Sequence, residues 1–170
     1  MSSFKFYYLF ALIPLLGYCQ TEKQNSKYLK SVGDIAFDSL MDRRDFFLCN
    51  EKDIMQYHNN SRGLEYKGEK LAIIESFKKK YVPIPDSSQD GLIRVRFVVN
   101  CKGQTDRFRI IAMDEDYQTK KFDERITQQI LDICKSLDGW LPKKKEDKEF
   151  DYYQYLIFKI QSGQITEILP

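Results

Sequence analysis

Hydrophobic and polar positions alternate in two consecutive segments of the C-terminal half of the chain. In residues 92–99 one side of the alternation is apolar and consists of Ile93, Val95, Phe97 and Val99. Residues 105–113 alternate in the same way and place Phe108, Ile110 and Ala112 on one side. The residues between them, Asn100-Cys101-Lys102-Gly103, are typical of a turn. The pattern predicts a β-hairpin with one apolar face.

A helix and two further strands are predicted after this hairpin. Residues 122–137 have a helical period, with one apolar face made of Ile126, Ile130, Ile133, Cys134 and Leu137. Residues 143–149 are expected to form a charged loop. Residues 152–160 are apolar on both sides in their second half, which is typical of a strand inside a sheet. Residues 165–169 are expected to form a short last strand.

The N-terminal part of the chain is less regular. Residues 69–81 are amphipathic, with Glu69 in the first turn and three lysines in the last, as the helix dipole favours. Short strands or turns are expected before this helix, and a linker follows it. The chain is therefore predicted to be an α+β protein, with an irregular N-terminal elaboration over residues 20–88 and a more regular module over residues 91–170.

The first nineteen residues have the features of a secretory signal peptide. Lys5 precedes an uncharged, mostly apolar stretch, and Gly17-Tyr18-Cys19 suits cleavage before Gln20. Two alternatives stay open. Lipidation at Cys19 is disfavoured by Tyr18, because such signals place a small residue there. An uncleaved anchor is disfavoured because the uncharged run has only sixteen residues and contains Pro14. We expect an exported protein without a transmembrane span in its mature chain.

Export allows the remaining cysteines to form a disulfide. Cys134 lies on the apolar side of the predicted helix, so we expect a buried free thiol there. Cys49 and Cys101 are then the leading pair, and three unpaired thiols are the alternative.

Composition excludes several classes of function. Lys and Arg total 27 against 25 Asp and Glu, a near balance that is not typical of a nucleic-acid-binding protein. The chain has a single His and lacks a phosphate-binding loop, a Ser-His-Asp set and a group of metal-ligand spacing. We therefore expect no enzyme, no catalytic residues, no cofactor and no metal site.

The order hairpin, helix and strand, together with its motifs, resembles the C-terminal domain of TonB, the periplasmic energy transducer. The matching residues are Gly91-Leu92-Ile93-Arg94-Val95-Arg96-Phe97-Val98-Val99-Asn100, Lys102-Gly103, Trp140-Leu141-Pro142, and Tyr155-Leu156-Ile157-Phe158-Lys159-Ile160 before Gly163. The resemblance covers residues 91–170. It implies a β-β-α-β(-β) module, with an antiparallel sheet and one packed helix, in a periplasmic protein that binds a partner strand at a sheet edge.

The chain departs from TonB in ways that affect function. TonB has an anchor whose polar residues couple it to a motor complex, and a long Pro-rich arm. Here the apolar segment has no ionisable residue between Lys5 and Glu22, and no proline lies between Pro14 and Pro83. We therefore expect binding without energy transduction.

The predicted hairpin collects arginines on its polar face. With a four-residue loop over residues 100–103, Arg94 lies opposite Arg109 and Arg96 lies opposite Arg107. The resemblance implies that Tyr153 and Tyr155 extend this face. Three interpretations stay open: a solvated face, an external anionic ligand or protein, or docking of N-terminal carboxylates, namely Asp34, Asp38, Asp42, Asp45, Glu51 and Asp53.

The sequence thus predicts a non-catalytic periplasmic module that binds envelope proteins. The expected contact surface is a sheet edge or the face of Arg94, Arg96, Arg107, Arg109, Tyr153 and Tyr155. The alternative is a structural, envelope-associated protein that self-associates through its sheet edge, as a homodimer.

Overall fold

The computed structural model describes residues 33–56, 64–86, 88–145 and 148–170. The predicted signal peptide over residues 1–19, including Cys19, lies outside these ranges. Within them, no helix has the length and the apolar character needed to cross a membrane. The elements are α1 (Glu69–Lys80), β1 (Gly91–Val99), β2 (Thr105–Met113), α2 (Glu124–Lys135), β3 (Lys143–Lys145), β4 (Lys148–Phe150), β5 (Tyr152–Gln161) and β6 (Gln164–Leu169).

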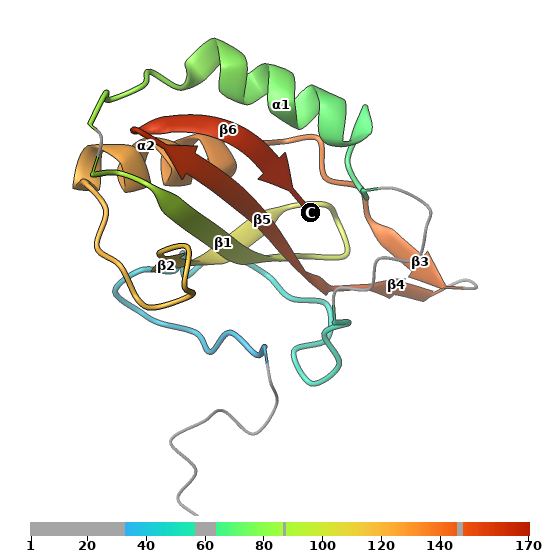
Figure 1. Ribbon diagram of the computed structural model, residues 1–170. Coiled ribbons are helices and arrows are strands. Elements are labelled where there is room, and N and C mark those ends of the chain that lie inside the picture. Colours follow the sequence, from blue (N-terminus) through green and yellow to red (C-terminus); the bar gives the residue numbers. More distant parts are fainter. Residues whose placement is uncertain (1–32, 57–63, 87, 146–147) are drawn as a thin grey trace, which may run out of the picture. The chain divides into compact units, whose positions relative to one another are not determined.

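Four of the strands form one antiparallel sheet in the order β2-β1-β5-β6 (Figure 1). The predicted interior position of β5 is confirmed, since this strand lies between β1 and β6. With two helices beside the sheet, the α+β class is confirmed as well.

Both helices pack against the same face of the sheet. The alternate β1 residues Ile93, Val95 and Phe97 are fully buried there, because side chains along a strand point to opposite faces in turn. They share one core with Ile73 of α1 and Ile130 of α2. Cys134 lies in this core as a free, buried thiol, as predicted. We call this side of the sheet the helix face.

The register of the predicted hairpin is wrong by two residues. The Asn100 amide donates to the Gln104 carbonyl at 2.8 Å, so the loop is one residue shorter than expected. A β-bulge follows, where Arg107 has a φ of 58°, and shifts the pairing by one more residue. Arg96 therefore lies opposite Arg109, and Arg94 lies opposite Ile111.

Beyond the bulge, this correction leaves the predicted faces of the strands unchanged. Side chains alternate with a period of two, so a slip of two residues returns each one to its original side. Ile110, for example, lies opposite Val95 in place of the predicted Phe108, but still on the apolar side of the hairpin.

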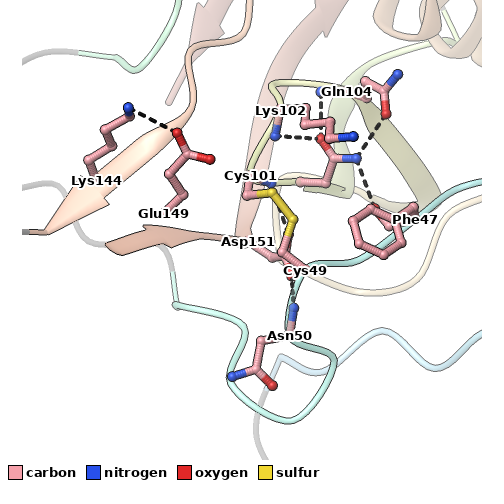
Figure 2. Close-up of a disulfide and its surroundings, with 10 residues drawn as sticks. Phe47, Cys49, Asn50, Cys101, Lys102, Gln104, Lys144, Glu149 and Asp151 are labelled. Carbon is pink, nitrogen blue, oxygen red and sulfur yellow. Dashed lines mark hydrogen bonds and ion pairs between the residues drawn. A yellow bond between two sulfur atoms is a disulfide. The ribbon is translucent and has the colours of Figure 1, made fainter. Parts of the chain in front are cut away.

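The prediction of a charged loop over residues 143–149 is wrong as well. Strands β3 and β4 form a short separate hairpin there. The Lys144 ammonium pairs with the Glu149 carboxylate across it at 2.9 Å (Figure 2). The lysine-rich sequence gives no hydrophobic alternation, which is why the periodicity does not detect these strands.

Residues 33–56, here called the strap, cover part of the opposite face of the sheet. The strap consists of turns and bends, with one isolated bridge from Met55 to Tyr152. Its Ile35 is buried against Val98 and Tyr153 in a second, smaller core. We call this side of the sheet the strap face.

Candidate protein-binding surfaces

The strap supplies carboxylates to two of the four predicted arginines. Arg109 binds Asp42 through two hydrogen bonds, Nη1 to Oδ1 and Nη2 to Oδ2, both of 2.7 Å. Arg107 donates to the Glu51 carboxylate at 2.7 Å and to the Ile35 carbonyl at 3.3 Å. For Arg107 and Arg109, these contacts match the interpretation in which N-terminal carboxylates dock on the arginine face.

The Asp42–Arg109 pair is the more enclosed of these two ion pairs. The Asp42 side chain is 1% exposed and that of Arg109 is 23% exposed. The hydrogen bonds from Arg109 lower the pKa of Asp42, against the opposing effect of burial. The same bonds raise the pKa of Arg109. Asp42 is therefore an anion at neutral pH and fixes the strap to β2.

Arg96 and Arg94 have different surroundings. The Arg96 guanidinium donates to the Gly33 carbonyl at the start of the strap. Burial and the charge of Arg94 lower the pKa of Arg96. The Arg94 guanidinium lies over the Tyr155 ring, 4.3 Å from its centroid. Tyr153 is buried under the strap. The predicted face of arginines and tyrosines is therefore partly covered by the strap, and its remaining part is centred on Arg94 and Tyr155.

The disulfide between Cys49 and Cys101 joins the strap to the β1–β2 turn, as predicted (Figure 2). Asp151 lies beside it and is fully buried. The Asp151 carboxylate accepts hydrogen bonds from the Cys101 amide at 2.9 Å and the Asn50 amide at 2.7 Å. One oxygen of Asp151 and the two sulfur atoms lie within 4.8 Å of one another. The disulfide leaves no thiolate for a metal, so this cluster has a structural role.

The outer edge of β6 is open along most of its length. At its start, the Ile84 amide donates to the Gly163 carbonyl at 3.4 Å, and the Gly163 amide donates to Gln89 at 3.0 Å. Beyond this point, within the described ranges, residues 165–169 have no backbone hydrogen bond to any segment other than β5. An edge strand of this kind presents unpaired N–H and C=O groups.

A groove of about 420 Å³ runs between this edge and α1. Its lining is mainly apolar but includes charged and other polar side chains, and consists of Lys70, Ile74, Phe77, Lys78, Tyr81, Pro83, Gln164, Ile165, Thr166, Glu167 and Ile168. The Tyr81 hydroxyl donates to the Gly163 carbonyl at 2.9 Å and joins the end of α1 to the β5–β6 turn. An edge strand beside an apolar groove can accept an extended peptide.

The other edge of the sheet, along β2, is engaged at both ends. The Arg43 side chain donates to the Thr105 carbonyl at 3.2 Å. At the far end the Lys120 amide donates to the Ala112 carbonyl at 3.0 Å. The bulge at Arg107 interrupts the strand between these contacts. Bulges and covering loops are features that prevent an edge from pairing with another strand.

Sequence reasoning did not identify the groove, although it identified several of its residues. The amphipathic pattern of residues 69–81 places Ile74, Phe77 and Tyr81 on the apolar side of the predicted helix, and Ile165 lies in the predicted last strand. The sequence does not contain the placement of α1 alongside β6, because the start of β6 at Gln164 lies 84 positions after the end of α1 at Lys80 and the packing of the two is tertiary. One signal for the groove is available. The apolar side of the predicted helix is wider than the stripe that α1 buries, which consists of Ile73 and Phe77.

In comparisons with known proteins, no family model matches the chain. No curated protein and no solved structure matches it either.

Proposed function

We propose that this protein is a non-catalytic, exported protein-binding module that takes a segment of an envelope protein as an added strand along β6. The observation that carries the proposal is the combination of an open β6 edge with the apolar groove between β6 and α1. The resemblance of residues 91–170 to the C-terminal domain of TonB supports the same mode of binding.

Strand addition would use both the β6 edge and the groove beside it. The backbone groups of the edge hold an extended peptide by hydrogen bonds, and alternate side chains of the peptide enter the groove. The side chains of Ile74 and Ile165 offer apolar contacts there, and Lys70 and Lys78 add positive charge to the lining. Affinity then comes from the edge, and selectivity comes from the groove.

A periplasmic location is part of this proposal. Residues 1–19 have the pattern of a cleaved signal peptide. The disulfide between Cys49 and Cys101 is stable in an oxidising compartment such as the periplasm. Both features support export.

Selection from a library of random dodecapeptides displayed on phage tests the proposal, with the full mature chain as bait. Peptides with apolar residues at alternate positions should be enriched. Ile74→Glu places a charge in the groove and should weaken their binding at least tenfold. Leu71→Glu is the matched control, because Leu71 lies on the same helix, is exposed and does not line the groove. This variant should bind like the wild type.

The outcomes separate binding of a partner from self-association. A stable dimer in sedimentation equilibrium, broken by Ile74→Glu and not by Leu71→Glu, would instead favour the structural protein that pairs through its own edge. Selected peptides that bind Ile74→Glu as tightly as the wild type would contradict the β6 site. Thermal unfolding of both variants confirms that each is folded.

A further inference from the structure

The strap covers only one end of its face of the sheet. Beyond it lie residues of intermediate or higher exposure, of which Ile111 is the most open at 43%. In the register of the sheet, Arg94 has Ile111 on one side and Ile157 on the other. We call this area the Arg94 patch, and it consists of Leu92, Arg94, Ile111, Met113, Tyr155 and Ile157.

Arg94 differs from Arg107 and Arg109 in its charge balance. Arg107 and Arg109 each have a carboxylate partner at 2.7 Å, whereas Arg94 forms no ion pair with any described residue. Its Nε atom is buried and has no hydrogen-bond partner in the described part of the chain. A buried donor of this kind is costly to leave unpaired.

The contacts of the strap indicate which chemical groups the strap face of the sheet can bind. Over the covered end it supplies carboxylates to Arg107 and Arg109, and it packs Ile35 against Val98 and Tyr153. The Arg94 patch repeats both features, a cation and adjoining apolar side chains. It therefore has a surface complementary to the same pair of groups, a carboxylate next to a large apolar side chain.

We propose that the Arg94 patch binds an extended segment of a partner protein that carries an Asp or Glu beside a large apolar residue. The carboxylate binds the Arg94 guanidinium, which Tyr155 holds in place by stacking. The apolar residue packs on Ile111 and Ile157. Because this surface is separate from the β6 edge, the inference stands or falls independently of the proposed strand addition.

Arginine Nε–H signals in ¹H–¹⁵N NMR spectra of the full mature chain test the proposal. The probe is the peptide acetyl-Ile-Glu-Ile-amide, and its isosteric control is acetyl-Ile-Gln-Ile-amide. The Arg94 Nε–H signal should shift with the Glu peptide, with at least tenfold weaker affinity for the Gln peptide. The Arg109 signal should not move, because Asp42 already occupies that guanidinium.

Two variants assign the effect to the patch. Arg94→Gln should abolish the binding, whereas Arg44→Gln, at an exposed strap position outside the patch, should retain it. Equal shifts with the two peptides, or no shift at Arg94, would overturn the proposal. So would a dimer in which a second copy covers the patch.

Discussion

Four arginines lie close together on neighbouring strands, and their charges need compensation. The register puts Arg96 directly opposite Arg109, an arrangement that is unfavourable between like charges. Asp42 removes much of this repulsion because it binds Arg109 through both carboxylate oxygens. A guanidinium and a carboxylate in this fork geometry form one of the stronger hydrogen-bonded pairs in proteins.

Asp42→Asn should destabilise the protein by about 2 kcal/mol at pH 7. Breaking a buried ion pair costs about 3–5 kcal/mol, and the partial exposure of Arg109 reduces that cost. Urea unfolding measures the change. Asp45→Asn, at an exposed position of the strap, is the matched control and should lie within about 0.5 kcal/mol of the wild type.

The same pair predicts a dependence of stability on pH. The pKa of Asp42 is lower in the folded protein than its ordinary value of 3.8, so this contribution is fully present above that value. It is lost as the pH falls through the lowered pKa. The difference in unfolding free energy between wild type and Asp42→Asn should therefore shrink between pH 5 and pH 2. A difference that stays constant over this range would contradict the account.

At the scale of elements, the strap has no regular secondary structure and depends on contacts with the sheet. The Asp151 carboxylate holds the Asn50 amide, and the Asn100 side chain donates to the Phe47 carbonyl at 2.8 Å. The disulfide joins the same part of the strap to the β1–β2 turn. Polar contacts and one covalent bond thus replace the strand pairing that the strap lacks.

Removal of the disulfide by Cys49→Ser with Cys101→Ser should destabilise the protein by about 4 kcal/mol. This value is the chain-entropy estimate for a sequence separation of 52 residues. Reductant should lower the urea midpoint of the wild type to that of the double variant and leave the variant unchanged. A wild-type midpoint that does not respond to full reduction would show that the bond adds nothing to stability.

Most of the elements could be predicted from the sequence, because periodicity is local, but β3 and β4 could not, because they have no hydrophobic alternation. The apolar side of α2, from Ile126 to Cys134, and the alternation of β1 both appear as expected. The register of the hairpin could not be predicted, because the bulge at Arg107 leaves no mark in the hydrophobic pattern. The sequence also could not show which acidic residues of the strap bind the arginines. That Asp42 and Glu51 do so depends on the path of an irregular segment.

At the scale of the whole molecule, and within the described residues, some faces and edges of the sheet are covered and others are open. The helices cover one face, and the strap covers part of the other. Contacts at both ends and a bulge protect the β2 edge, whereas residues 165–169 of β6 face a groove. This asymmetry between the two edges is the central support for strand addition at β6.

Amide hydrogen exchange of β6, measured by NMR with and without a dodecapeptide selected as above, tests this claim most directly. An added strand should protect the β6 amides that point away from β5 and slow their exchange at least tenfold, while the β2 amides stay unchanged. Binding that leaves the β6 amides unprotected, or that protects β2 instead, would contradict the account.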